Sequence, residues 1–369
     1  MVDAVVVGAG IGGLAAALAL QRRGWKVTVV EQATALENVG AGLAVAPNGL
    51  RALDALGVGG PVRALSALQG TAGIQKPGGG WISRTDAAEA ERRFGEPTIV
   101  VHRAALVSVL ADALRPGTVR LGVAATDVSA GGTVVTAGGT LTGEVVVAAD
   151  GLRSPVRGKL FPDAPAPVYA GVTSWRFVVP RPPGELVLSE TWGDAKVFGV
   201  VALGDGRVYC YATAPAPAQQ RAADEKAELM RLFGEWHAPL PALIASAEAV
   251  IRTDIRCLDP TPTTFHKGRV ALLGDAAHAM TPNLGQGACQ ALEDAVVLAA
   301  YAGDLNRYSA ERVPRTTAVA AASRRIGRMA GLGGAASTVR DAGMSLAGKL
   351  GPNLVLRQMD PIFTWRPPS

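Results

Sequence analysis

Glycine and acidic residues recur in this chain at spacings that bind a phosphorylated cofactor. The first such turn, Gly8-x-Gly10-x-x-Gly13, lies between the apolar run "AVVV" and an Ala/Leu-rich stretch. Gly8 is expected to make the tight turn, Gly10 to leave room for a pyrophosphate, and Gly13 to let a helix pack close to a strand. Glu31 ends the next apolar run, where an acid accepts hydrogen bonds from ribose hydroxyls. The turn predicts a dinucleotide site but does not separate NAD from FAD.

Two further apolar runs end at an acidic residue beside a glycine. "EVVVAA" ends at Asp150-Gly151, and "RVALL" ends at Gly274-Asp275. Acids just past the carboxyl ends of strands in an α/β sheet lie where ligands bind. Both acids are therefore candidate ligand contacts.

The stretch after Asp275 has an unusual amount of bare backbone. Pro282, Gly285 and Gly287 precede a helix-like run that starts at Ala288. Glycines let backbone amides approach a ligand closely, and a helix N-terminus presents unpaired N–H groups with a partial positive charge. We expect these amides to face a bound group.

These stretches together resemble the FAD-dependent aromatic hydroxylases, which are single-component flavoprotein monooxygenases with a para-hydroxybenzoate hydroxylase-like fold. The resemblance covers nearly the whole chain, and five separate motifs occur in the family's order. They are "GAGLAVAPNGLRALDALG" (40–57), "HRAALVSVL" (102–110), the Asp150-Gly151 segment, the Gly274-Asp275 segment and "RYSAERVPRTTAV" (307–319).

The resemblance implies roles for particular residues. Asp275 would hold the ribityl chain of FAD, and the helix from Ala288 would aim its amides at the N1/C2 carbonyl region of the flavin. Asp150 and Gly151 would contact FAD and NAD(P)H. The other cofactor contacts that it implies are Gly42, Arg103, Pro282, Gly285 and Gly287.

The resemblance also implies a reaction. NADH or NADPH would dock transiently and reduce noncovalently bound FAD, and O2 would then form a flavin C4a-hydroperoxide that hydroxylates a small aromatic or heteroaromatic substrate. No second glycine fingerprint follows a strand, so the nicotinamide would have no Rossmann domain of its own. Epoxidation, Baeyer-Villiger oxygen insertion and a non-catalytic flavin- or ligand-binding homologue are the alternatives.

The segment from 166 to 254 has period-two strands broken by short Pro/Gly turns, which predicts an antiparallel sheet. In similar proteins this sheet forms a wall of the substrate cavity. Arg176, on the opposite face of its strand from Trp175, would bind an acidic or phenolate substrate, or would pair on an exposed face with Glu190. Arg176 and Gln286 are the predicted substrate contacts.

One stretch of this sheet departs from the family's pattern. Many relatives read "VPLGDGRVYW", whereas this chain reads "VALGDGRVYC", with Ala202 and Cys210 in place of a proline and an aromatic residue. The change would either widen the substrate pocket or only repack the sheet.

Other polar residues are expected to be structural. Glu293 and Asp294 should pair or cap within the helices, and His278 lies in a helical "AAH" step. The remaining histidines share no ligand spacing, so no metal site is expected. They are His102, His237 and His266.

These residues must be positioned by an α/β fold. We predict a Rossmann-type FAD-binding domain with an inserted antiparallel-sheet substrate domain and a helical C-terminal region. The predicted boundaries are 1–68, 98–165 and 255–303 for the FAD-binding domain, 69–97 and 166–254 for the sheet domain, and 304–369 for the helical region.

The composition fits a cytoplasmic globular protein. Of 369 residues, 49% are hydrophobic and 18% are charged, which argues against disorder. The net charge of +5 comes from scattered arginines, so nucleic acid is not an expected partner. The apolar N-terminus lacks a basic region and is expected to be a strand, turn and helix, so we expect neither a signal peptide nor integral membrane association. A monomer or homodimer is expected.

Overall fold

The computed structural model describes residues 2–36, 41–66, 72–85, 87–184, 186, 188–350 and 356–368. Gly40, the first residue of the 40–57 motif, lies outside the described residues, as does the predicted domain boundary at 68/69.

A six-stranded sheet forms the first layer of the molecule, in the order β17-β18-β11-β1-β2-β7. Its strands are parallel except β17, which pairs antiparallel with β18. Valine dominates the central strands because helices cover them on both sides. The strands are β1 (Asp3–Val7), β2 (Lys26–Glu31), β7 (Val119–Leu121), β11 (Val145–Ala148), β17 (His266–Lys267) and β18 (Val270–Leu272).

Three helices cover this sheet: α1 (Ile11–Arg22), α5 (Arg103–Asp112) and α10 (Gly287–Ala300). α1 packs closely on α10 at Gly12, where an added Cβ would lie 3.3 Å from the Cβ of Ala291. The chain leaves this sheet between β2 and β7 and again between β11 and β18, and strands from both excursions form the second sheet.

The second sheet has seven strands, in the order β16-β12-β15-β14-β13-β4-β5, and only β13 and β4 pair in parallel. One face is covered by α7 (Glu225–Phe233) and α8 (Leu240–Ala245), two helices that the period-two pattern did not predict. The strands are β4 (Ala72–Gln75), β5 (Trp81–Thr85), β12 (Val168–Pro180), β13 (Leu188–Gly193), β14 (Lys196–Ala202), β15 (Arg207–Pro215) and β16 (Ile251–Cys257).

Smaller elements complete the two layers. The hairpin-like pair β3 and β6 lies against the second sheet, and β8, β9 and β10 form an antiparallel meander that we did not predict. Their bounds and those of the short helices are β3 (Gly42–Val45), β6 (Ile99–His102), β8 (Ala125–Val128), β9 (Thr133–Thr136), β10 (Gly139–Thr142), α2 (Pro47–Ala55), α3 (Gly59–Ala64), α4 (Ala87–Phe94), α6 (Pro155–Leu160), α9 (Asp275–His278) and the 3₁₀ turn η1 (Pro282–Leu284).

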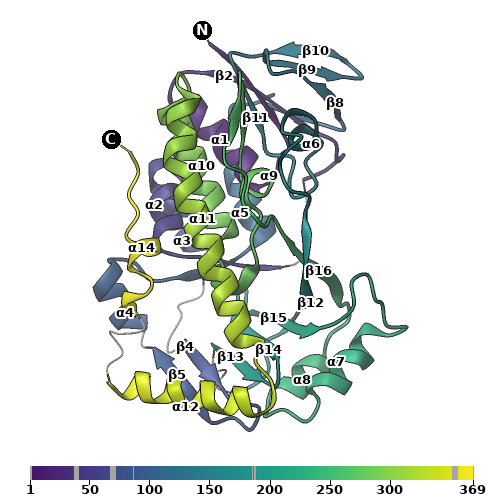
Figure 1. The fold of residues 1–369 in the computed structure, drawn as a ribbon, viewed down its shortest axis with the longest axis vertical. Helices are drawn as coiled ribbons and strands as arrows, with labels where there is room; N and C mark the ends of the chain where they lie inside the picture. Colours follow the sequence, from purple (N-terminus) through teal and green to yellow (C-terminus); the bar gives the residue numbers. More distant parts are fainter. Residues whose placement is uncertain are drawn as a thin grey trace.

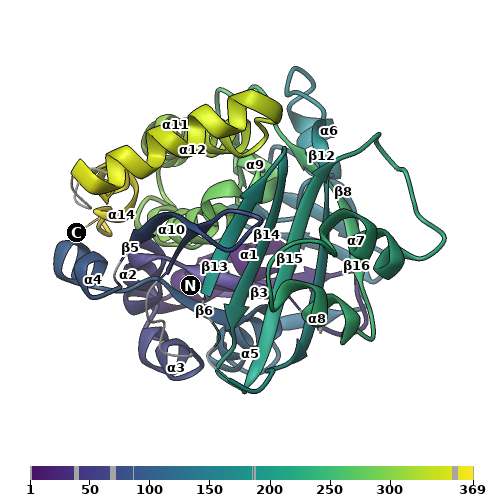
Figure 2. The ribbon, with the colours of Figure 1, turned by 90° about the horizontal axis from the view of Figure 1, so that it is seen from below.

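The C-terminal part is helical, as predicted. α11 (Leu305–Ala330) runs from beside the parallel sheet to the second sheet, and α12 (Gly334–Leu350) then crosses near β4 and β5 (Figures 1 and 2). A short helix, α14 (Asp360–Phe363), packs near α2. The mixed α/β fold with a parallel sheet, an antiparallel sheet and C-terminal helices is the one expected from the sequence, whereas the domain boundaries stay a prediction.

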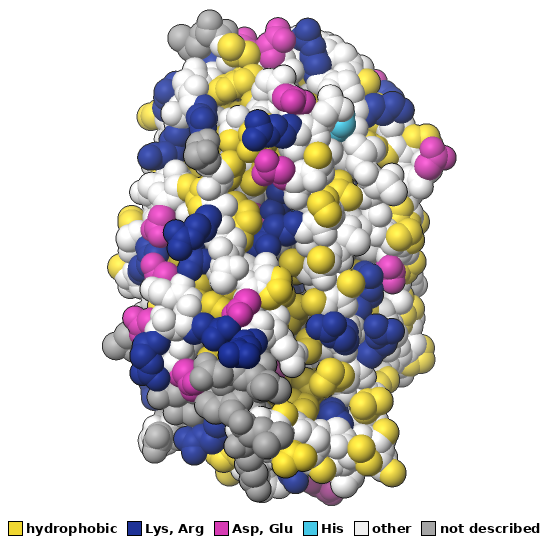
Figure 3. Space-filling model, turned by 60° about the vertical axis from the view of Figure 1, so that its left-hand side comes forward, with side chains coloured by type: hydrophobic (Ala, Val, Ile, Leu, Met, Phe, Trp, Pro, Cys, Tyr) yellow, Lys and Arg dark blue, Asp and Glu magenta, His cyan; other side chains and the backbone are white. Residues whose placement is uncertain are grey.

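The surface carries charges of both signs. Figure 3 shows Lys and Arg side chains interspersed with Asp and Glu over one face rather than gathered in a block. Among the described residues, no helix has the length and apolar character needed to cross a membrane. That part of the chain also contains no cluster of three or more His, Cys, Asp or Glu residues able to hold a metal ion.

Candidate active site

The turn between β1 and α1 has the geometry of a phosphate-binding turn. Gly8 has a φ of +102°, and a Cβ there would lie 2.4 Å from the carbonyl oxygen of Ala149. A Cβ on Gly13 would lie 1.9 Å from the carbonyl oxygen of Gly8, so this residue allows the close helix packing. A Cβ on Gly10 would meet no atom within 4 Å. Gly10 thus faces the open space that a pyrophosphate needs.

Glu31 lies beside this turn at the end of β2. Its Oε2 accepts a hydrogen bond from the Ala9 N–H at 2.7 Å, and its Oε1 accepts one from the Ala33 N–H at 2.8 Å. The carboxylate is half-buried at the edge of the open space and retains acceptor capacity for a ribose hydroxyl.

Asp150 follows β11, the neighbour of β1 in the sheet. Its Oδ2 accepts a hydrogen bond from the Val156 N–H at 3.2 Å, whereas its Oδ1 is buried without a hydrogen-bond partner among the described residues. Burial raises the pKa of this carboxyl group. Because buried polar atoms are nearly always hydrogen-bonded, Oδ1 is a site where a ligand hydroxyl would be satisfied.

The Gly274-Asp275 turn lies at the end of β18, the next strand along. Gly274 has a φ of +63°, and Asp275, the first residue of α9, is exposed although Gly274 and Ala276 on either side are buried. The side chain of Asp275 therefore projects into open space. Asp150 and Asp275 lie at the carboxyl ends of adjacent parallel strands.

The glycine-rich segment ahead of α10 is also open. Gly285 has a φ of +62°, and a Cβ there would lie 3.3 Å from the Cβ of Ala44 in β3. α10 begins at Gly287, where a Cβ would meet nothing within 4 Å. The N–H groups of this first turn have no partner within the helix. The open backbone at Gly10 and Gly287 and the partnerless Oδ1 of Asp150 are features that suit a bound FAD, whose contacts with these residues stay a prediction.

Gly42 and Arg103 lie side by side. Gly42 in β3 pairs with His102, and Arg103 begins α5 with its N–H donating to the carbonyl oxygen of Ala41 at 2.9 Å. A Cβ on Gly42 would lie 2.4 Å from the ring of Tyr209. The absence of a side chain at Gly42 is thus required by the second sheet. Contact of either residue with FAD stays a prediction.

The Trp175 face of β12 is closed to substrate. Trp175 is 1% exposed, packs under α7 and α8, and donates from Nε1 to Glu225 at 2.8 Å. Arg176, on the other face, is half-buried, and its Nη2 donates to the Thr253 hydroxyl at 2.6 Å. Its Nε is buried without a hydrogen-bond partner among the described residues. The two faces alternate as predicted.

Glu190, considered from the sequence as a partner for Arg176, bonds elsewhere. It accepts hydrogen bonds from the Tyr211 hydroxyl at 2.5 Å and from Trp192 Nε1 at 2.7 Å. The alternative of an Arg176–Glu190 pair on an exposed face is therefore wrong.

Two tyrosines on the Arg176 face were missed by the sequence reasoning. Tyr211 is opposite Arg176 in the β12–β15 register, and Tyr209 is opposite Val178. Burial raises the pKa of Tyr209 to about 12, and burial together with Glu190 raises that of Tyr211 well above its usual value. Both hydroxyls are protonated at neutral pH. The period-two pattern of "RVYCYAT" was a signal that could have placed them on one face.

The Arg176 face is turned toward the open segment of the first layer. Tyr209 packs against Ala41 and Ala44 of the β3 region, and Ala44 approaches Gly285. The second sheet thus forms a wall opposite the expected flavin position.

Gln286, the other predicted substrate contact, is 1% exposed. Its Oε1 accepts a hydrogen bond from Asn48 Nδ2 at 2.9 Å, and the same Asn48 group donates to Glu293 at 2.7 Å. Only Nε2 of Gln286 is buried without a partner. Contact of Gln286 with substrate stays a prediction, and the sequence did not reveal that Asn48 of α2 bonds to this side chain.

Behind α10 lies a buried polar network that joins it to α11. Arg312 contacts Glu293 and Asp294 at 2.6 Å each, and Arg315 contacts Glu293 at 2.6 Å. Glu293 and Asp294 are both fully buried. The expectation that the two acids pair within the helices is confirmed.

His278 belongs to the same network. Its Nε2 lies 2.5 Å from Asp294 Oδ2, which also accepts the Gly274 N–H at 2.9 Å. Burial alone would raise the pKa of Asp294, but His278 and Arg312 hold it at about 2. His278 is structural, as predicted, and the network fixes the turn that carries Asp275.

Cys210 lies on the closed face of the second sheet. It is fully buried with Phe177, its neighbour across the β12–β15 pair, in the core under α7 and α8. The sequence left open whether Cys210 widens the substrate pocket or only repacks the sheet. Its position in this core shows that Cys210 repacks the sheet. All three cysteines are free and buried.

A basic groove of about 610 Å³ opens between the Asp150-Gly151 loop and the second sheet. It includes Thr253, the partner of Arg176, and Asp254, which accepts the Gln219 N–H at 2.9 Å. Its remaining lining side chains are Leu152, Arg153, Gln219, Arg221 and Arg256.

The chain is similar to a known protein family and to curated proteins over most of its length. A family model described as an FAD binding domain matches residues 1–323. Aurachin C monooxygenase/isomerase of Stigmatella aurantiaca is 41% identical over 343 residues, which cover 88% of each chain. The 2-heptyl-3-hydroxy-4(1H)-quinolone synthase of Pseudomonas aeruginosa is 33% identical over 308 residues, 80% of this chain and 79% of that one.

A solved structure is also similar over almost the whole chain. The crystal structure of Klebsiella pneumoniae HpxO complexed with FAD and uric acid has a TM-score of 0.89 and 29% identity, and the match covers 98% of this chain and 96% of that one. The second sheet and the C-terminal helices are thus part of the shared fold.

Proposed function

Since this chain belongs to the FAD-binding domain family of flavoprotein monooxygenases, whose members use FAD and NAD(P)H, we propose that it hydroxylates a fused nitrogen heterocycle of the 4(1H)-quinolone kind. A relative's name carries such a ring, and a similar structure holds uric acid, another fused nitrogen heterocycle with ring carbonyl groups. The family acts on aromatic and heteroaromatic substrates.

One observation supports this substrate class above others. The wall opposite the expected flavin position carries a guanidinium group, Arg176, with an unpartnered buried Nε, beside the protonated Tyr209. Such donors bind a carbonyl oxygen or an enolate oxygen of a ring and favour the electron-rich, deprotonated form. An electron-rich ring is the form that accepts oxygen from a flavin monooxygenase.

Different residues of the chain have different proposed roles in the reaction. When bound, FAD accepts hydride from NAD(P)H and activates O2 for transfer to the ring. Gly10, Asp150 and Asp275 would hold the cofactor, and the amides at the start of α10 would face its pyrimidine ring, where they stabilise negative charge. Arg176 would orient the substrate against the wall, and the buried ring of Tyr209 on the same face would help to exclude water.

The basic groove would receive the nicotinamide nucleotide. It adjoins the Asp150-Gly151 loop, and Arg153, Arg221 and Arg256 offer charge for its phosphates. Thr253 lines the groove and also bonds to Arg176, so the groove and the substrate wall are neighbours.

The Arg176→Met variant tests the substrate assignment. Methionine keeps an unbranched apolar chain and removes the charge, so FAD content should be unchanged while kcat/KM for the ring substrate falls about ten- to a hundredfold. A poorly placed ring also leaves more reducing equivalents as hydrogen peroxide. The measurements are NAD(P)H oxidation, peroxide yield and product mass for a panel of quinolones and other heteroaromatic compounds.

Arg181→Met is the matched control, because Arg181 is an exposed arginine at the end of the same strand. If Arg176→Met has a normal rate and a normal coupling of NAD(P)H oxidation to product formation, the assignment of Arg176 as a substrate contact is wrong. If the mass and structure of the products show an epoxide or a ring-expanded lactone, the reaction is another kind of oxygen insertion and not hydroxylation.

A further inference from the structure

One row of residues crosses the second sheet on the Arg176 face. Tyr211 is opposite Arg176 in the β12–β15 pair and opposite Gly199 in the β14–β15 pair. Gly199 is in turn opposite Glu190 in the β13–β14 pair. Residues directly opposite each other in paired strands point to the same face of the sheet. The row therefore lies on the proposed substrate wall, with a guanidinium group at one end and a carboxylate at the other.

Gly199 lets the ring of Tyr211 lie across the sheet. A Cβ on Gly199 would lie 2.1 Å from Cζ of Tyr211, so a side chain there would collide with the ring. The Tyr211 hydroxyl thereby reaches β13, where it donates to Glu190 Oε1 at 2.5 Å. Arg176 leans the other way, toward Thr253 of β16. The guanidinium and the hydroxyl are thus farther apart than the Cβ atoms of a cross-strand pair, which are about 5 Å apart.

The carboxylate of Glu190 is held by two donors. Its Oε1 accepts from Tyr211, and its Oε2 accepts from Trp192 Nε1 at 2.7 Å. Glu190 and Tyr211 are both only half-buried, so both keep surface that a bound molecule can contact. A phenol oxygen that donates its proton can still accept a hydrogen bond. The Tyr211 oxygen can therefore accept an N–H or O–H group of a bound ring.

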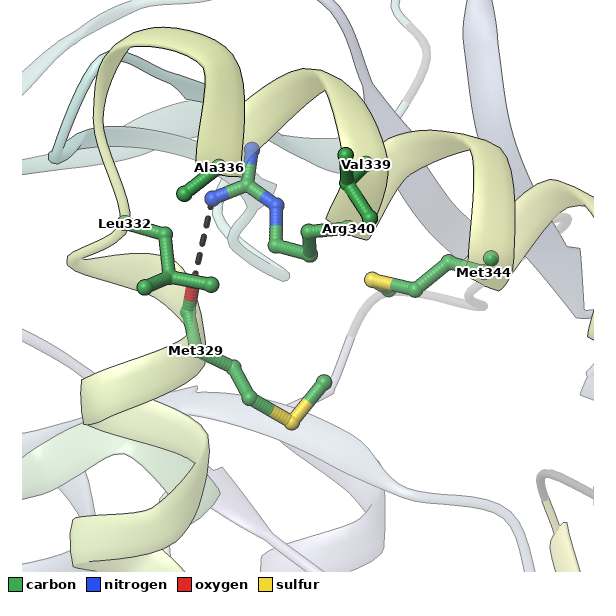
Figure 4. A pocket seen from close by; sticks show the side chains of 7 residues that line it. Met329, Leu332, Ala336, Val339, Arg340 and Met344 are labelled. Atoms are coloured by element: carbon green, nitrogen blue, oxygen red, sulfur yellow. Dashed lines mark hydrogen bonds between the residues drawn. The ribbon is translucent and has the colours of Figure 1, made fainter.

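Arg340 of α12 is a charged group beside this row, since its guanidinium lies 5.4 Å from the centre of the Trp192 ring. Its Nη1 donates to the carbonyl oxygen of Met329, as Figure 4 shows, and its Nε donates to Asp341 at 2.9 Å. Its charge is thus paired with Asp341 and not with Glu190. Because burial and Glu190 raise the pKa of Tyr211, the tyrosine keeps its proton at neutral pH. Glu190 is the member of the pair that can gain one.

We propose that Tyr211 and Glu190 form a relay that removes a proton from the substrate ring. As the ring N–H bond breaks, its proton passes to the Tyr211 oxygen and the Tyr211 hydroxyl proton passes to Glu190. The tyrosine is thus neutral before and after the step. The electron pair of the N–H bond stays on the ring and is shared with the ring carbonyl oxygen, which Arg176 would bind.

The inference rests on the proposed function, because the ring must lie on the Arg176 face for its N–H to reach Tyr211. In a 4(1H)-quinolone the carbonyl and the N–H are at opposite positions of one ring. Two groups that lean apart along the wall suit this arrangement. Loss of the proton makes the ring more electron-rich, which is the form that accepts oxygen.

Glu190→Gln and Tyr211→Phe test the relay on 2-methyl-4(1H)-quinolone. Glutamine accepts the same hydrogen bonds through its amide oxygen but does not gain a proton at neutral pH. The kcat of product formation should therefore fall about 10²- to 10⁴-fold in each variant, with KM and FAD content close to those of the parent. The double variant should be no slower than the slower single variant, because the two residues act as a unit. Independent, multiplied losses would overturn the relay.

A matched compound and the pH separate proton transfer from a structural role. 1,2-Dimethyl-4-quinolone has no N–H to lose, so Glu190→Gln should not slow its oxidation further, whereas a structural defect would slow both compounds. With the N–H compound, product formation by Glu190→Gln should rise with pH, because hydroxide ion can then remove the proton. In the parent it should fall on the acid side, where the carboxylate is protonated. Equal losses with the two compounds, or a variant rate that does not depend on pH, would overturn the proposal.

Glu225→Gln is the matched control. Glu225 also accepts a hydrogen bond from a tryptophan Nε1, that of Trp175 at 2.8 Å, but on the closed face of the same sheet. This variant should keep the kcat and the pH profile of the parent. If it reproduces the losses of Glu190→Gln, those losses come from a disturbed sheet and the relay is wrong.

A separate measurement distinguishes failure of the relay from failure of the substrate assignment. If the parent protein oxidises no quinolone, the proposed substrate ring is wrong, and 4-nitrophenol is then added to the FAD-bound protein at a pH where the free compound is neutral. Difference spectra of the parent should show the phenolate, whose proton lies on Glu190, and those of Glu190→Gln should show the neutral phenol. Phenolate in both proteins, or in neither, overturns the relay.

Discussion

At the scale of single residues, the predicted glycine turn can be compared with the structure through its backbone geometry. Gly8, Gly10 and Gly13 are distinguished by what a Cβ would meet, and only at Gly10 is that space open. The spacing of such residues is visible in the sequence because the turn is local. Gln286 shows the limit: its burial depends on Asn48, which is 238 residues away. A long-range contact of that kind leaves no local pattern.

Asp275 and His278 should respond differently to replacement by alanine. Asp275 is exposed at the cofactor side, so Asp275→Ala should weaken FAD binding about ten- to a hundredfold and leave the stability of the FAD-free protein unchanged. His278→Ala should lower the free energy of unfolding by about 1–3 kcal/mol, because it removes one of the hydrogen bonds to the buried Asp294 carboxylate, which keeps only Gly274 and Arg312 as partners. FAD titration followed by fluorescence and urea unfolding are the measurements.

Asp163→Ala is the control for the loss of one exposed carboxylate. If the two variants are equally stable and His278→Ala loses more FAD affinity than Asp275→Ala, the assignment of Asp275 as the cofactor contact and of His278 as a structural residue is wrong.

At the scale of elements, alternation and composition predicted the strands and the C-terminal helices, since each pattern is set by one buried face. Arg176 and Trp175 were placed on opposite faces of β12 for this reason. The helices α7 and α8 were missed because they are inserted between strands whose pattern dominated the segment. The pairing of α10 with α11 was predicted only as a tendency of Glu293 and Asp294 to find partners, and Arg312 supplies them.

The pairing of α10 with α11 should make part of the stability depend on pH. The pKa of Asp294 is held at about 2, below the ordinary value of 3.8, by His278 and Arg312 against the effect of burial. A group with a lowered pKa in the folded state stabilises the protein above its unfolded pKa, and this contribution is lost as the pH falls through the folded value. The contribution is thus complete above about pH 4 and declines toward pH 2.

Asp294→Asn should therefore lower the free energy of unfolding by about 3–5 kcal/mol at pH 7, because it leaves Arg312 buried with one partner fewer. The difference between the variant and the parent should shrink as the pH falls below 4. Urea unfolding at pH 7, 5 and 3.5 measures it. Asp127→Asn, which breaks the exposed pair with Lys159, should change little at any of these values. A difference for Asp294→Asn that is constant from pH 7 to 3.5 would contradict the linkage.

At the scale of the whole molecule, the functional spaces lie between layers. The proposed substrate wall belongs to the second sheet and the predicted cofactor turns to the first, and α11 runs from one sheet to the other (Figure 1). The basic groove beside this central site is built from three segments that are distant in the chain, 152–153, 219–221 and 253–256. Sequence motifs predicted the glycine turns of the candidate cofactor site, but the groove could not be predicted, because it depends on how the layers pack.

The basic groove predicts how the protein binds its reductant. Arg153 lies on the Asp150-Gly151 loop and Arg256 on β16, so phosphates bound there would meet charge from both layers, partly offset by Asp254. Arg153 is exposed, and the loss of one solvated charge contact is worth at most about 1 kcal/mol. Arg153→Gln should therefore raise the KM for NAD(P)H about two- to fivefold without changing FAD content.

Salt separates this explanation from a general disturbance of the loop. The KM for NAD(P)H of the parent protein should rise between about 0.01 and 0.3 M salt as the charges are screened, and that of Arg153→Gln should rise less. Arg120→Gln, an exposed arginine on β7 at the far edge of the parallel sheet, should behave like the parent. If the KM of the parent does not depend on salt, or if both variants change alike, the phosphates of the nicotinamide nucleotide do not lie in this groove, and hydride must reach the flavin from another side.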